Sequence, residues 1–181
     1  MDERAFKLYE KCEAMSVLTQ KACNHWSLVK FIFQIPLILT SSVMCILNSF
    51  DTGNGNMKIP NVVVNGVSVL LISYQSNLKV FEKCELFKNL SNQFLQLAHD
   101  VEGKDQNELD RNTVNIFIEK YDALIATCLF EDIPKSIKLD VIKLFEGKAL
   151  PLQLNGGSGL YISKVKDHTV HNGAELCHLQ V

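Results

Sequence analysis

The sequence predicts an all-α protein built on a long helical hairpin that crosses a membrane twice. Two uncharged runs, 31–50 and 59–78, are each long enough to span about 30 Å of hydrocarbon as a helix. A short loop rich in turn-forming residues separates them. Apolar residues at heptad spacing continue on both outer sides. With 181 residues, 47% of them hydrophobic and 21% charged, the chain is neither disordered nor a fibrous repeat.

Charge and cysteine content exclude two classes of protein. The formal net charge is -2, with 18 basic and 20 acidic side chains, whereas a general nucleic-acid binder needs a basic surplus to displace counterions. We therefore expect no nucleic-acid partner. Six cysteines occur singly, which fits neither a disulfide framework nor a zinc ribbon and favours a reducing compartment.

The predicted first helix begins well before the first apolar run. Residues 1–30 carry charges throughout, unlike a cleaved signal peptide. Apolar residues recur there at alternating spacings of four and three, which is the seam of a coiled coil, and the same spacing returns after the second run until Gly103. The seam consists of Leu8, Cys12, Met15, Thr19, Ala22, Trp26 and Val29 on the first arm and Phe87, Leu90, Phe94, Leu97 and Val101 on the second. We expect each arm to be one helix continuous with its span, so that 1–103 forms a hairpin ending in an antiparallel cytoplasmic stalk.

The two runs differ in polarity. FIFQIPLILTSSVMCILNSF, at 31–50, is strongly apolar, whereas IPNVVVNGVSVLLISYQSNL, at 59–78, carries more amide side chains. The loop DTGNGNMK between them suits an antiparallel connection. Pro36 and the asparagines leave open an alternative, in which the hairpin is buried inside a soluble helical-bundle interaction module.

Flanking residues predict the orientation of the spans. Lys30 precedes the first span, Lys79 follows the second, and Trp26 lies one turn farther out, as expected of anchors at a membrane interface. Basic residues are abundant at both outer ends, while the loop holds a single lysine. The positive-inside rule then places both termini on the cytoplasmic side of an integral membrane protein.

Polar residues recur inside both spans at intervals of seven. Side chains of this kind are costly at bilayer depth unless they are paired or face water. They indicate either hydrogen bonds across the hairpin or a water-filled lumen in a homo-oligomer. The residues are Gln34, Ser41 and Asn48 in the first span and Asn61, Ser68 and Gln75 in the second, with Asn65 one turn from Asn61.

The rest of the chain predicts two further helices and a tail. The D-x-x-E pattern of Asp105 and Glu108 is typical of a helix start, and an apolar face continues to Cys128. Pro134, at a first-turn position, leads into a short amphipathic helix that Gly147 ends. We expect the helices within 104–147 to pack on the stalk, and 148–181 to be a flexible tail with one strand-like run at 160–165.

A resemblance to a known family rests on layout and on two segments. The hairpin follows a tryptophan and continues as NLKVFEKCELFKNLSNQFLQLAHDVE and then FIEKYDALIATCLFEDIPKSI. Over about residues 5–145 this resembles the SLATT family, two-span domains associated with SMODS and SLOG proteins, particularly the versions in large DNA viruses. The resemblance implies a membrane effector that oligomerises and perturbs a bilayer when a sensor protein signals. The chain has no recognisable attached sensor, which leaves room for a viral membrane or virion component.

The sequence offers little support for catalysis or a cofactor. His168, His171, Cys177 and His178 are zinc-binding residue types, but their spacing fits no compact zinc site and favours solvated tail residues. NGGSG, at 155–159, lacks the Lys-Ser/Thr of a phosphate-binding loop and is typical of a linker. We therefore expect a non-enzymatic protein without a cofactor and without a metal.

Three functions remain open. The first is an oligomeric membrane effector or pore-type module in a host membrane. The second is a structural protein that links a bilayer, such as a virion inner membrane, to a capsid or other overlying protein. The third is the soluble interaction module.

Overall fold

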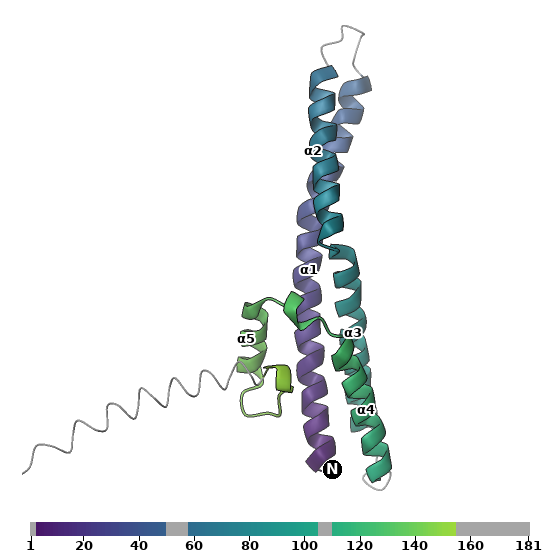
Figure 1. Cartoon of the computed structure of the whole chain (residues 1–181), viewed down its shortest axis with the longest axis vertical. Helices are drawn as coiled ribbons and strands as arrows, with labels where there is room; N and C mark the ends of the chain where they lie inside the picture. Colours follow the sequence, from purple (N-terminus) through teal and green to yellow (C-terminus); the bar gives the residue numbers. More distant parts are fainter. Residues whose placement is uncertain (1–2, 50–57, 105–109, 155–181) are drawn as a thin grey trace, which may run out of the picture. The chain divides into compact units, whose positions relative to one another are not determined.

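The computed structural model describes residues 3–49, 58–104 and 110–154, and every regular element in those ranges is helical. The elements are α1 (Glu3–Ser49), α2 (Lys58–Asn77), α3 (Val80–Glu102), α4 (Arg111–Thr127), the 3-10 turn η1 (Phe130–Asp132) and α5 (Lys135–Leu144), as Figure 1 shows. The prediction of an all-α chain is confirmed for these residues. The predicted loop after residue 50, the tail motifs and the strand-like run lie outside them.

The chain divides into two compact units. The core unit comprises the described residues of Met1–Thr19 and Leu90–Val181, and the hairpin unit comprises those of Gln20–Asn89. Both α1 and α3 contribute residues to each unit.

In the core unit, apolar faces of four segments enclose one small hydrophobic core. Met15 and Leu18 of α1 are fully buried, as is Phe94 of α3. The rings of Phe94 and Tyr121 of α4 meet edge to face with centroids 5.9 Å apart, so α4 lies beside α3 (Figure 1). The core is completed by the buried side chains of Ile133, Val141, Phe145, Leu150 and Leu154.

The segment after α5 is tied to α1 by two polar contacts. Glu10 Oε2 accepts from the backbone nitrogen of Ala149 at 2.9 Å. Lys148 Nζ lies 3.2 Å from Glu13 Oε2. Gly147, at φ +85, turns the chain after α5 in a conformation that L side chains rarely adopt. This turn lets residues 148–149 reach α1.

Helix ends in the core unit differ slightly from expectation. Asp110 caps α4, accepting from the Arg111 backbone nitrogen, while the predicted Asp105 and Glu108 pattern lies outside the described residues. Pro134 occupies the N-cap position of α5, one position before the predicted first turn. Proline is tolerated there because the position needs no amide donor.

In the hairpin unit, α1 runs antiparallel to α2 and to the start of α3. Phe33 contacts Tyr74 with ring centroids 5.5 Å apart, Lys30 Nζ lies 4.5 Å from the Phe81 ring centroid, and Lys83 Nζ lies 4.5 Å from that of Trp26. From one pair to the next, the residue number on α1 decreases while that on α2 and α3 increases, as expected for antiparallel helices. In Figure 1, α2 lies along the distal half of α1.

The second arm is not continuous with its span, which corrects the prediction of one uninterrupted helix. Leu78 and Lys79 separate α2 from α3, and Lys79 has φ +50. The Lys79 amide bonds to Ser76 O at 3.1 Å, a tighter turn than the α-helix, and the i to i−4 pattern resumes at Lys83. A left-handed conformation at a residue with a Cβ costs roughly 1–2 kcal/mol, so neighbouring contacts must hold this break.

Candidate functional site

The hairpin unit carries an extended exposed apolar surface. Large aliphatic and aromatic side chains that would be buried in an ordinary core lie open on both of its long helices. On α1 they are Phe31, Ile32, Ile35, Ile38, Leu39, Val43 and Ile46, and on α2 they are Val62, Val63, Val67, Val69, Leu70, Ile72 and Tyr74. No Lys, Arg, Asp or Glu occurs between Lys30 and Asp51 or between Lys58 and Lys79. We call the fourteen exposed side chains of α1 and α2 given above the apolar surface.

One helix in the described part of the chain is long and apolar enough to cross a membrane. Within α1, an 18-residue window has mean hydropathy 1.8, and 6% of it is buried. Core helices of soluble proteins and signal sequences can match this length and composition as well. Core helices, however, are mostly buried.

Hydroxyl groups of the first run bond to their own helix. Thr40 Oγ1 donates to Pro36 O at 2.8 Å, Ser41 Oγ to Leu37 O at 2.8 Å and Ser42 Oγ to Ile38 O at 2.8 Å. These donors are satisfied without water or a partner helix. The helix continues through Pro36 without ending.

The two polar stripes lie differently in the structure. On α1, Gln34 is half-buried and Ser41 is exposed, while the side chain of Asn48 lies outside the described residues. On α2, Asn61 and Ser68 are half-buried, and Gln75 is 7% exposed. In the α2 stripe, Gln75 therefore turns inward within the hairpin unit, whereas Asn65 is exposed.

Hydrogen bonds in the α2 stripe run along the helix. Asn65, which is exposed, donates from Nδ2 to Asn61 Oδ1 at 3.1 Å, and Ser68 Oγ donates to Val64 O at 2.9 Å. The Nε2 atom of Gln75 is buried and has no hydrogen-bond partner in the described part of the chain. A buried donor of this kind destabilises a fold unless another molecule satisfies it.

The three predicted anchors gather at one end of the apolar surface. Lys30 and Trp26 are half-buried, each in the cation–π pair given above. Lys79, at the break between α2 and α3, lies 3.7 Å from Glu82 with both side chains largely exposed. Charged and aromatic groups thus directly flank the apolar surface: Trp26 and Lys30 precede its α1 residues, and Lys79 follows its α2 residues.

The predicted stalk seam is buried in both units. Its residues Leu8, Cys12, Met15, Thr19, Ala22, Phe87, Leu90, Phe94, Leu97 and Val101 are each at most 5% exposed, while Trp26 and Val29 are half-buried. The heptad pattern does not mark Ser16 and Ser91, which exchange hydrogen bonds between α1 and α3 inside the core unit. Their position in the sequence could have indicated this contact, since each serine directly follows a seam residue.

Two cysteines of the core unit are chemically shielded. Burial raises the pKa of the Cys12 thiol to about 12 and that of the Cys128 thiol to about 12. Burial also raises the pKa of Tyr121, with smaller contributions from both thiols. Thiols that stay protonated are poor nucleophiles and poor metal ligands. Among the described residues, no group of three or more His, Cys, Asp or Glu side chains could hold a metal ion, and the four tail candidates lie outside that part.

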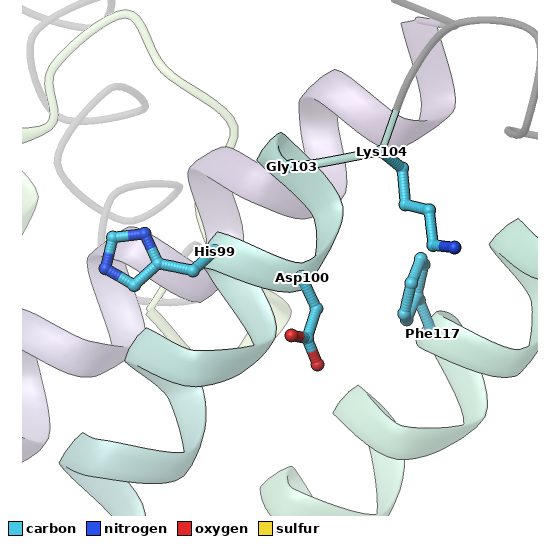
Figure 2. Close-up of a pocket in the computed structure, with 5 residues that line it drawn as sticks. All are labelled: His99, Asp100, Gly103, Lys104 and Phe117. Atoms are coloured by element: carbon cyan, nitrogen blue, oxygen red, sulfur yellow. The ribbon is translucent and has the colours of Figure 1, made fainter.

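The core unit also has a shallow groove of about 350 Å³ between α3 and α4. Figure 2 shows Lys104 reaching towards Phe117, with Asp100 beside them, while the imidazole of His99 points away. The imidazole instead lies 3.7 Å from Glu102. One carboxylate and one ammonium in an open groove do not form a nucleophile and base pair of the kind that catalysis needs.

Comparisons with protein-family models, with curated proteins and with solved structures find no match to this chain. The resemblance to the SLATT family therefore stays a prediction from sequence layout.

Proposed function

We propose that this chain is a non-enzymatic, two-span membrane protein that oligomerises in the bilayer and acts as a membrane effector or pore-type module. The proposal places residues of about 31–50 and 59–78 in the hydrocarbon and both termini on the cytoplasmic side. The resemblance to SLATT domains is consistent with it.

The single observation that carries the proposal is the apolar surface. Fully burying one Val, Leu or Ile side chain is favourable by about 1.5–3 kcal/mol, so water is a poor solvent for the twelve aliphatic side chains exposed on these two helices. A lipid bilayer removes this penalty without any further protein. The charged and aromatic anchors at the end of the surface fit the polar boundary of that bilayer.

Internal hydrogen bonding supports the same proposal. A bilayer core offers no water to exposed hydroxyl groups, and Thr40, Ser41 and Ser42 each bond to their own backbone. The alternative of a soluble bundle would need another protein to cover α1, since only 6% of its apolar window is buried in this chain.

Oligomerisation is supported by the exposed amide of Asn65. Its Nδ2 bonds to Asn61 Oδ1, which leaves the Asn65 carbonyl oxygen and the second Asn65 amide hydrogen on an exposed side chain of α2. In hydrocarbon these groups would be unsatisfied unless a second copy presents matching amides. Gly66 lies beside them, and nothing lies within 4 Å of where its Cβ would be, so another helix could approach closely.

Membrane insertion is tested by two lysine substitutions at exposed isoleucines. Ile38→Lys changes the apolar surface, whereas Ile116→Lys changes an exposed isoleucine of α4 in the core unit. A lysine at the centre of a span costs about 2.5–3.5 kcal/mol on insertion scales. We expect flotation with liposomes to be lost or sharply reduced for Ile38→Lys and unchanged for Ile116→Lys. Recovery of the unmodified protein in the supernatant without detergent would contradict the proposal and favour the soluble module.

The oligomeric arrangement is tested by cross-linking in liposomes. We expect Asn65→Ala to lose most of the cross-linked species and Ser42→Ala, which removes a hydroxyl bonded within its own helix, to keep them. Release of an encapsulated dye by the unmodified protein would support the effector role. Tight vesicles that contain confirmed oligomers would instead favour the structural role in linking a bilayer to overlying proteins.

A further inference from the structure

The hairpin unit holds a pair of thiols that face each other across two helices. Cys23 of α1 and Cys84 of α3 are both free cysteines, and their side chains lie close enough to interact with each other. Cys23 is 8% exposed, whereas Cys84 is half-buried. One thiol is therefore held inside the helix pair while its partner can be reached from solvent.

Helix register explains why these two cysteines meet. Within the hairpin unit, α1 runs antiparallel to the start of α3. Trp26 lies three residues after Cys23, and Lys83 lies one residue before Cys84. Lys83 Nζ lies 4.5 Å from the Trp26 ring centroid, so the helical turns that carry the two thiols face each other.

The residues next to the two thiols are tightly packed. Thr19, Ala22 and Phe87, which lie within one turn of one thiol or the other, are fully buried. Burial raises the pKa of the Cys23 thiol, the neighbouring Cys84 raises it further, and Lys88 opposes this by a smaller amount. The half-buried thiol is thus the one suited to react first, and the buried thiol is the one placed to resolve the product.

We propose that Cys23 and Cys84 form a redox-sensitive pair, which a peroxide converts into an intramolecular disulfide that links α1 to α3. The inference does not depend on whether the apolar surface lies in a membrane. In the sequence the two cysteines occur singly and lie far apart, so their spacing does not reveal the pair.

The reaction proceeds in two balanced steps. The Cys84 thiolate attacks one oxygen of hydrogen peroxide, the O–O bond breaks, and a sulfenic acid forms with release of hydroxide, which takes up the thiol proton as water. Cys23 sulfur then attacks the sulfenic sulfur, an S–S bond forms, the S–O bond breaks, and a second water leaves. Each sulfur is oxidised by one electron, peroxide is the oxidant, and a dithiol reductant reverses the process.

Peptide mapping of the full chain tests the proposal. The purified protein is treated with a small excess of hydrogen peroxide, remaining thiols are alkylated, and trypsin is added. The expected product is a cross-linked pair of the peptides ACNHWSLVK, containing Cys23, and CELFK, containing Cys84. The pair should disappear on reduction. The oxidised chain should unfold about 5–15 °C higher than the reduced chain.

Three serine variants provide the controls. Cys23→Ser and Cys84→Ser should lose the cross-linked peptide, whereas Cys45→Ser, at the exposed cysteine of α1, should keep it. Circular dichroism checks that each variant is folded. The proposal is overturned if Cys84 is oxidised to sulfinic acid without a cross-link. It is also overturned if Cys84 pairs with Cys84 of a second chain, or if Cys45 is oxidised while Cys84 stays reduced.

Discussion

Ser16 and Ser91 exchange hydrogen bonds between two helices: Ser16 Oγ donates to the Ser91 carbonyl oxygen at 3.2 Å, and Ser91 Oγ donates to the Ser16 carbonyl oxygen at 3.1 Å. Each side chain thus reaches the backbone of the opposite helix, which requires α1 and α3 to approach closely at this point. Both serines are buried, so water does not compete for these bonds. The pair fixes the register of α1 against α3 in the core unit.

Removing either hydroxyl should destabilise the protein measurably. We expect Ser16→Ala and Ser91→Ala each to lower the free energy of unfolding by about 1 kcal/mol, because one buried hydrogen bond is lost. Denaturant unfolding in detergent measures this change. Asn92→Ala, at the exposed neighbour of Ser91, should stay within about 0.5 kcal/mol of the parent. Equal stability of Ser91→Ala and the parent would show that the bonds do not hold the register.

Gln75 is expected to limit the stability of the hairpin unit. The buried Nε2 of Gln75 has no hydrogen-bond partner among the described residues. Gln75→Leu should therefore raise the free energy of unfolding by about 1 kcal/mol, which is measured as a higher thermal midpoint. Gln34→Leu, at a half-buried amide, should have a smaller effect. A lower midpoint for Gln75→Leu would mean that the amide is satisfied in the assembled protein. Dye-release assays on the same variants would then test whether that amide faces a lumen.

Stability should fall at alkaline pH because two buried thiols resist ionisation. The pKa of each rises from 9.0 to about 12 on folding, so above pH 9 the unfolded chain releases protons that the folded chain keeps. Unfolding therefore becomes more favourable as pH rises from about 9 towards about 12. Unfolding curves across that range measure the effect, and Cys128→Ala should reduce the slope. A flat profile would contradict the burial of these thiols.

Glu10 should matter more than its neighbour Glu13. The Glu10 carboxylate accepts from the backbone amide of Ala149, whereas Glu13 forms an ion pair with a substantially exposed Lys148. We expect Glu10→Ala to speed hydrogen exchange in residues 148–154 by about tenfold, and Glu13→Ala to change it little, since surface ion pairs contribute about 0–1 kcal/mol. The reverse order would mean that the ion pair holds this segment.

The spacing of the apolar residues predicted much of the fold, because a helix that is buried on one side carries apolar residues at intervals of three and four. Leu8, Cys12, Met15, Phe94 and Leu97 all recur at heptad positions, and all are buried. The same reasoning could not find the break at Lys79, since neither glycine nor proline marks it and a left-handed residue depends on its tertiary surroundings.

The polar stripes show a second limit of sequence spacing. Heptad intervals place Ser41 in the polar stripe of α1 and Ser68 in that of α2. Both hydroxyls nevertheless bond to carbonyl oxygens of their own helices. Spacing alone does not show whether a serine bonds along its helix or across to another. Ser16 and Ser91 bond across to the opposite helix because the two helices approach closely there. That approach depends on packing and not on residue spacing.

The account depends most on whether the apolar surface lies in lipid, and Cys45 is placed to decide it. This cysteine is exposed on α1 within the proposed first span, so water would reach it if the chain were soluble. A Cys23→Ser variant, which leaves Cys84 unpaired, is reconstituted into vesicles opened to both aqueous sides and treated with a charged maleimide under reducing-agent-free conditions. The account predicts that Cys84 is alkylated at once while Cys45 reacts only after the bilayer is dissolved and the chain denatured, because a charged reagent does not enter the hydrocarbon. Alkylation of Cys45 as fast as Cys84 in intact bilayers would contradict the central claim.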